Sequence, residues 1–153
     1  MSSSEISALE PLVGSWRTEV VVDGEVLMRG EVTNEWIEDG NYLRVRSRSE
    51  PPVPEAPPEW HENAPLSMVT IVGADDASGT LTALYSDVRG VRRVQQWSVE
   101  DGVWRQWRDA EGFSQRFRGL ISEDGDTIEG VSEYSKDGET WHVDLELIYR
   151  RAD

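Results

Sequence analysis

The sequence predicts an all-β protein, a closed antiparallel up-and-down β-barrel of about ten strands with a short N-terminal helix. Two observations lead to this fold class. A residue followed by glycine marks eight turns along the 153 residues, five of them as Asp-Gly, and Asp-Gly is a strong signal for a hairpin turn. The segments between these turns are rich in Val, Thr, Ile, Tyr and Trp, which favour strands.

The turns divide the chain into ten expected strands. A ninth connector, residues 51–65, contains six prolines, and no strand can run through it. Residues 4–12 are expected to form a short helix with Ser4 as its cap. The expected strands are 12–22, 26–38, 41–50, 66–74, 80–87, 91–99, 103–109, 113–121, 127–135 and 140–150.

Closure of the sheet follows from the short connectors. No helix long enough for a crossover is expected between strands, so neighbouring strands are expected to be antiparallel. Ten such strands either curl into a barrel or stack as two sheets. Closure removes both exposed edges, so we favour one barrel domain over residues 1–153.

Turn positions assign the two faces of several strands. A turn at Asp39-Gly40 pairs residues whose numbers sum to 79, which places Asn34 and Trp36 inward and the Glu35–Arg44 pair in water. The stripe of Arg44, Arg46 and Arg48 is therefore expected to be solvated.

Two further strands are assigned in the same way. In the first hairpin, a three-residue loop over 23–25 with a bulge would turn Val26 inward. On the last strand, alternation places Trp141 and Val143 inward and His142 outward, on the face of Asp144 and Glu146.

The inward faces are not purely apolar, which suggests a cavity. Buried amides, phenols and guanidinium groups need a partner, and that partner can be another side chain, water or a ligand. A ten-stranded barrel is wide enough to enclose a small hydrophobic or amphipathic molecule, mostly apolar with one polar group. The alternative is a filled barrel whose polar residues satisfy one another. The candidate ligand-binding residues are Asn34, Trp36, Tyr85, Arg93, Gln95, Trp97, Gln115, Phe117 and Tyr134.

Composition argues against several classes of function. With 15 basic and 30 acidic residues the net charge is −15, which disfavours nucleic acid and membrane surfaces as partners. With no cysteine and two histidines, neither a metal site nor a nucleophilic triad is expected, and no cofactor is predicted. No apolar run approaches the length of a membrane span, and the first ten residues lack the layout of a signal peptide, so a cytoplasmic location is expected.

Gly14-Ser15-Trp16 at the start of the first strand, with Arg151 beyond the last, resembles the calycin pattern of lipocalins and their relatives. In that superfamily the tryptophan closes one barrel end and a late arginine packs across its ring. Longer segments resemble a bacterial family of lipocalin-like ten-stranded barrels that has no settled activity. These segments are 85–90, 113–117, 124–130 and 141–149, together with Glu35-Trp36.

Two better-known relatives of such barrels provide comparisons. Fatty-acid-binding proteins hold a carboxylate with a late Arg-x-Tyr, which the order Tyr149-Arg150-Arg151 does not match. Nitrobindins bind haem through a histidine of the last strand, which would be His142. The nitrobindin opening Gly-x-Trp-x-Gly-x-Gly is missing, since Arg17 and Thr18 follow Trp16.

Four functions therefore stay open at this stage. The first is ligand binding, in which Arg93 would meet an anionic or carbonyl group unless it pairs with acids of neighbouring strands. The second is a cofactor-independent cyclase or isomerase acting by positioning. The third is haem binding through His142, and the fourth is a filled barrel acting through its surface. The 51–65 loop, with Trp60, is expected to be a lid, a passive excursion or a homodimer contact.

Overall fold

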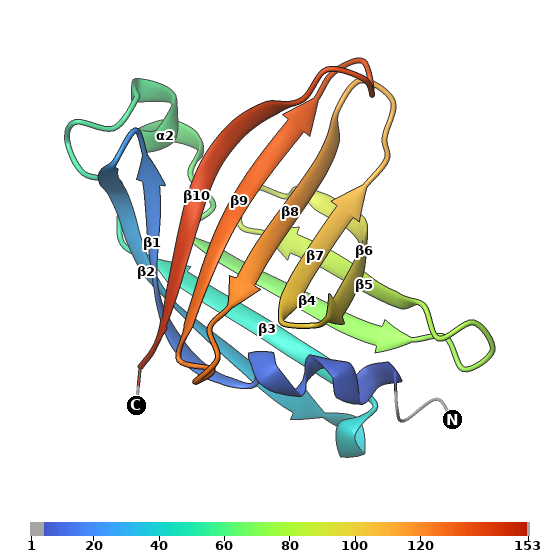
Figure 1. Cartoon of the computed structure of the whole chain (residues 1–153). Coiled ribbons are helices and arrows are strands. Elements are labelled where there is room, and N and C mark those ends of the chain that lie inside the picture. The colour runs from blue at the N-terminus through green and yellow to red at the C-terminus, as the bar shows by residue number, and fades with distance from the viewer. Residues whose placement is uncertain (1–4, 153) are drawn as a thin grey trace.

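Ten antiparallel strands close into a barrel in the computed structural model, which describes residues 5–152 (Figure 1). Around the barrel the order is β1-β10-β9-β8-β7-β6-β5-β4-β3-β2, so the predicted closed meander is confirmed. The strands are β1 (Gly14–Val22), β2 (Glu25–Ile37), β3 (Tyr42–Ser49), β4 (Ser67–Ala74), β5 (Leu81–Asp87), β6 (Arg92–Glu100), β7 (Val103–Arg108), β8 (Ser114–Ile121), β9 (Thr127–Ser135) and β10 (His142–Arg151).

Pairing of the first and last strands completes the ring. β1 pairs with β10 from Trp16↔Arg151 to Val21↔Glu146, so neither terminal strand is a free edge. The β2–β3 hairpin has the predicted register, with Glu35 opposite Arg44. Those two side chains form an ion pair, as expected for the outward face.

The first hairpin differs from its prediction. Val22 pairs with Glu25, so the loop has two residues, and the register shifts between Val20 and Val21 because β2 holds one extra residue near Leu27. Val26 is thus opposite Val21 rather than on the inward face, and the inward placement of Val26 is wrong.

The last strand also contains a bulge that the sequence pattern did not reveal. The pairing with β9 shifts between Val143 and Leu145, so His142 lies opposite Tyr134 on the inner face and Val143 lies on the outer one. The prediction that His142 shares the outer face with Asp144 is therefore wrong. Trp141 likewise lies outside, where its ring stacks on the Arg116 guanidinium, with Cζ 4.0 Å from the centroid.

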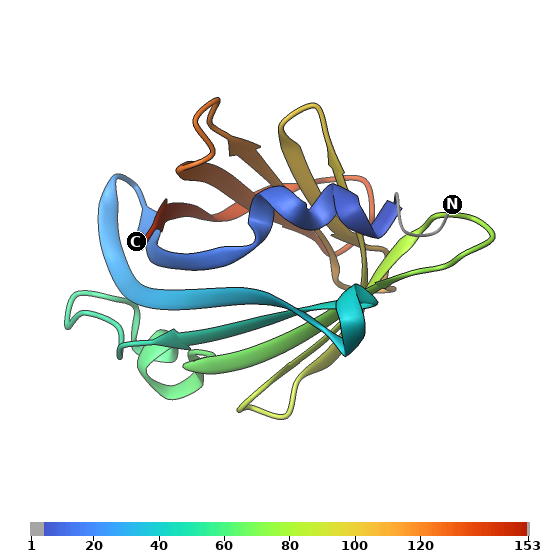
Figure 2. The same ribbon diagram turned by 90° about the horizontal axis from the view of Figure 1, so that it is seen from below.

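A 3-10 helix, η1 (Ser7–Leu12), lies across the lower end of the barrel (Figure 2). Leu9 and Leu12 have no exposed surface and belong to the hydrophobic core. The Leu12 carbonyl accepts hydrogen bonds from the Trp16 indole at 2.9 Å and from the Asn34 amide at 2.7 Å. The expected short helix is thus present in 3-10 form, while its expected cap, Ser4, lies outside the described residues.

Arg151 joins both ends of the chain at this closed end. Its guanidinium lies 4.2 Å from the centroid of the Trp16 ring, the contact that the calycin resemblance implies. It also donates hydrogen bonds to the carbonyls of Pro11, Val13 and Gly125. Gly14, at φ +124°, permits this approach, because a Cβ there would lie 2.6 Å from Arg151 Nη1.

The 51–65 connector packs beside the β1–β2 hairpin at the opposite, open end and contains a short helix, α2 (Pro58–Asn63) (Figure 1). Its backbone bonds to β2 through Val53 N–H and the Leu27 carbonyl, 2.9 Å apart, and Ala56 is buried. A further 3-10 turn, η2 (Glu38–Gly40), links β2 to β3. Within residues 5–152 no helix has the length and apolar character needed to cross a membrane.

Substitution of Arg151 tests the closed end. Arg151→Lys should lower the free energy of unfolding by about 2–4 kcal/mol, because lysine loses the planar stacking on Trp16 and the forked hydrogen bonds to backbone carbonyls. The matched control is Arg150→Lys, whose exposed pair with Glu19 is worth at most about 1 kcal/mol. Urea unfolding of both variants measures the difference, and equal losses would contradict this role of Arg151.

Candidate ligand-binding site

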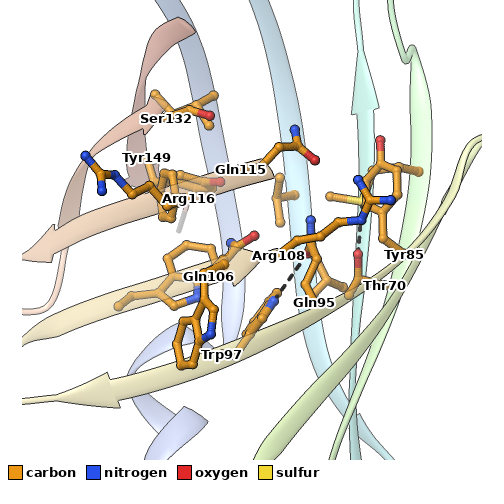
Figure 3. Close-up of a pocket in the computed structure, with 17 residues that line it drawn as sticks. Thr70, Tyr85, Gln95, Trp97, Gln106, Arg108, Gln115, Arg116, Ser132 and Tyr149 are labelled. Atoms are coloured by element: carbon orange, nitrogen blue, oxygen red, sulfur yellow. Dashed lines mark hydrogen bonds between the residues drawn. The ribbon is translucent and has the colours of Figure 1, made fainter. Parts of the chain in front are cut away.

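A cavity of about 170 Å³ lies inside the barrel, with walls contributed by every strand except β1 (Figure 3). The residues that line it are Val32, Val45, Met68, Thr70, Tyr85, Gln95, Trp97, Trp104, Gln106, Trp107, Arg108, Gln115, Arg116, Phe117, Ser132, Leu147 and Tyr149.

The inner part of the cavity is an aromatic cluster centred on Trp104. Its ring centroid lies 5.2 Å from that of Trp97, 5.0 Å from Phe117 and 5.6 Å from Tyr149. Tyr149 in turn contacts Trp16 edge to face at 6.3 Å, which connects this cluster to the closed end. Such pairs add roughly 0.5–1.5 kcal/mol each to the free energy gained by burial, so this part of the wall is firmly packed.

Two glycines shape the wall beside Phe117. Gly119 on β8 pairs with Gly130 on β9, and together they leave room for the Phe117 ring. A Cβ on Gly130 would lie 2.4 Å from that ring. The ring can therefore lie flat against the sheet instead of filling the centre of the barrel.

The upper wall is polar. Gln95, Gln106, Arg108 and Gln115 all lie on inward faces yet are only half-buried, because part of their surface borders the cavity. Gln95 accepts a long hydrogen bond, 3.5 Å, from the Trp97 indole. The cavity thus has an aromatic inner end and an outer end of amide and guanidinium groups.

Tyr85, Asp87 and Arg89 form a rigid cluster beside this polar end. The Tyr85 hydroxyl donates to Asp87 at 2.6 Å, and the Arg89 guanidinium bonds the same carboxylate, whose side chain has no exposed surface. Burial would raise the pKa of Asp87, but the hydrogen bonds from Arg89 and Tyr85 outweigh it and hold that pKa well below the usual range. Burial, with the Asp87 carboxylate, raises the pKa of Tyr85 to about 12.

Three rings in contact, which we call the rim stack, form part of the rim at the open end. Phe113 and Tyr134 stack with centroids 5.8 Å apart, and Tyr134 and His142 lie 5.4 Å apart. The Arg93 guanidinium lies over the Phe113 ring, 5.5 Å from its centroid. The bulge in β10 is what brings His142 into this stack.

A side opening separates β6 from β7 near the rim. Their pairing ends at Gln96↔Trp107, although β6 remains paired with β5 as far as Arg92. A groove lies over this gap on the outer side, and it shares Tyr85, Trp107 and Arg108 with the cavity. We refer to this gap, flanked by residues 92–95 and 108–110, as the side opening.

The nine candidate residues fall into separate groups. Tyr85, Gln95, Trp97, Gln115 and Phe117 line the cavity. The other four candidates point inward but lie outside its wall: Asn34 and Trp36 bond Leu12 and Glu10 at the closed end, Arg93 lies beside the side opening, and Tyr134 belongs to the rim stack.

Sequence reasoning missed Trp104, Gln106 and Arg108. A signal was available, because Arg93-x-Gln95-x-Trp97 is mirrored after the Asp101-Gly102 turn by Trp-x-Gln-x-Arg over residues 104–108. A hairpin about that turn places both patterns on one face, with Trp97 opposite Gln106.

The haem hypothesis does not fit this site. His142 is exposed and its ring packs against Tyr134 at the rim. A porphyrin is several times larger than a cavity of about 170 Å³, and cofactor-sized sites span roughly 300–1,000 Å³. Among residues 5–152, no three His, Asp or Glu side chains gather where they could hold a metal ion.

Comparison with known proteins identifies the fold but no function. No protein-family model matches the sequence, and no curated protein matches it. The crystal structure of Rv2717c from M. tuberculosis is similar, with a TM-score of 0.59 and 17% identity over 97% of this chain and 98% of that one. A DUF3598-family protein of unknown function from Nostoc punctiforme aligns over 97% and 99% of the two chains, but its TM-score of 0.28 and 8% identity support no argument.

The glycine pair gives a test of the cavity wall. Gly130→Ala should lower the free energy of unfolding by about 1–3 kcal/mol, because the new methyl group displaces the Phe117 ring. Combining it with Phe117→Leu should cost less than the sum of the single changes, since the smaller side chain makes room. Urea unfolding of the four proteins measures the coupling, and strict additivity would contradict the contact.

The Asp87 cluster predicts a pH dependence of stability. Because its pKa is lower in the folded than in the unfolded protein, the Asp87 carboxylate stabilises the fold at neutral pH, and that contribution is lost as the pH falls below about 4. Asp87→Asn should therefore cost about 1–3 kcal/mol at pH 7. The gap from the parent protein should narrow on acidification, as followed by unfolding at pH 7, 5 and 3, and a gap that is constant with pH would refute the assignment.

Proposed function

We propose that the protein binds a small, mostly apolar organic molecule with one polar group inside the barrel. The observation that carries this proposal is the division of the cavity into an aromatic inner end and a polar outer end. An enclosed apolar space of about 150 Å³ is known to accept benzene, so about 170 Å³ suits a ligand built on one ring.

Free hydrogen-bonding groups in the cavity wall support the same proposal. The Tyr149 hydroxyl has no hydrogen-bond partner among the described residues, and neither does the buried Trp104 Nε1. Burial raises the pKa of the Tyr149 phenol, so at neutral pH it keeps its proton and can donate it in a hydrogen bond. Unpartnered donors in a cavity wall are costly unless a ligand or water reaches them.

The wall favours binding over the alternative of a cofactor-independent cyclase or isomerase. Its titratable groups are two tyrosines and two arginines, while no Asp, Glu or His from residues 5–152 contributes to it. The pKa values of both tyrosines are raised, so neither accepts a proton from a substrate near neutral pH.

The fold is consistent with this role. Closure of one end by Trp16 and Arg151 is the arrangement expected of calycins, and eight-stranded lipocalin barrels hold one small ligand in the same interior position. We therefore infer a lipocalin-like binding barrel, in which the closed end forms the base of the cavity and the rim and side opening face solvent.

Benzamide, an uncharged ring with one polar group, tests the proposal. It should bind the parent protein with one-to-one stoichiometry in a ligand-observed NMR titration. Ser132→Leu should weaken binding at least about tenfold, because the added side chain occupies the cavity. The control Thr33→Leu, on the exposed face of β2, should leave the affinity unchanged. Equal affinity in both variants would contradict binding in the barrel.

A further inference from the structure

Two arginines near the cavity lack acidic partners. Of the fourteen arginines, all within the described residues, six have a carboxylate within 4.0 Å. Six of the remaining eight are exposed, and only Arg93 and Arg108 are half-buried. A guanidinium that is partly removed from water without a counter-ion is costly, so these two side chains need an explanation.

Their positions bring the two charges to one place. Arg93 comes from β6 and Arg108 from β7, one on each side of the side opening. Arg93 Nη1 donates to Gln115 Oε1 at 2.9 Å, while Arg108 Nη1 donates to the Phe113 carbonyl at 3.4 Å. Both guanidinium groups thus converge on residues 113–115, and Arg108 and Gln115 themselves line the cavity.

Electrostatics around the pair favour an incoming anion. Burial, followed by the positive charge of Arg108, lowers the pKa of Arg93, which means that each charge is unfavourable for the other. Asp87, the carboxylate whose charge acts on Arg93, is already bound by Arg89 and Tyr85. Asp109 borders the groove but is exposed and makes no ion pair with either arginine.

We propose that the polar group of the ligand is a carboxylate, bound at the side opening by Arg108 and Arg93 while the ring occupies the aromatic end of the cavity. The forked donors of arginine match the two oxygens of a carboxylate, and each such bond is stronger than one between neutral groups. Gln115 would then exchange its bond with Arg93 for a contact with the ligand. This inference rests on the proposed function and narrows the ligand class to one-ring organic acids.

Benzoate and benzamide separate the inference from the proposed function, because they have the same shape and number of non-hydrogen atoms but differ in charge. Both are titrated into the parent protein and into Arg93→Gln, Arg108→Gln and the control Arg105→Gln. Arg105 lies on β7 like Arg108, but it is exposed and outward-facing and has no ion pair. Thermal unfolding of each variant checks that it is folded.

The parent protein should bind benzoate at least about tenfold more tightly than benzamide. Arg108→Gln and Arg93→Gln should each weaken benzoate binding far more than benzamide binding, so that most of that preference is lost, while Arg105→Gln should change neither affinity. Equal binding of the two probes, or a preference that survives both substitutions, would overturn the carboxylate site and leave the proposed function intact. Failure of both probes to bind would overturn the inference and the proposed function together.

Discussion

The contact between Arg151 and Trp16 is the constraint on which the rest of this barrel depends. It joins the last residue of β10 to a residue near the start of β1, and the same guanidinium donates hydrogen bonds to the carbonyls of Pro11, in η1, and of Val13, just after it. With the helix fixed across the lower end, Leu9 and Leu12 fill the base of the barrel. The interior is consequently packed near the termini, and the cavity lies above Trp104, toward the rim and the side opening.

Above that base, the chemistry of the cavity changes with height. Aromatic rings surround its lower part, and amides and guanidinium groups surround its upper part. The mirrored residue pattern of β6 and β7 produces this gradient. On the inward face of each strand, tryptophan lies nearest the base of the barrel, glutamine lies above it, and arginine lies nearest the rim. An amphipathic ligand would match this gradient in one orientation, with its apolar part against the aromatic rings and its polar group toward the amides and guanidinium groups.

The order of the strands around the barrel and most of their pairing register could be predicted from the sequence, because Asp-Gly turns and alternating side chains define hairpins locally. The sequence did not place the bulges near Leu27 and Asp144, since one extra residue leaves no compositional trace yet moves His142 from the outer to the inner face. The alternation of inward and outward side chains also does not show how far along the barrel axis an inward residue lies. Asn34 and Trp36 face inward as predicted, but they meet η1 at the closed end, which depends on tertiary packing of a segment far away in the sequence.

The separation of β6 from β7 has a consequence for association between molecules. A closed barrel normally has no free strand, yet here the β7-facing side of residues 92–95 lacks a ladder partner from β7. Such backbone invites strand addition by a second chain, and charged side chains are a common protection against it. Arg92 and Arg93 stand at this short edge, so the positive charge there can keep molecules from joining edge to edge.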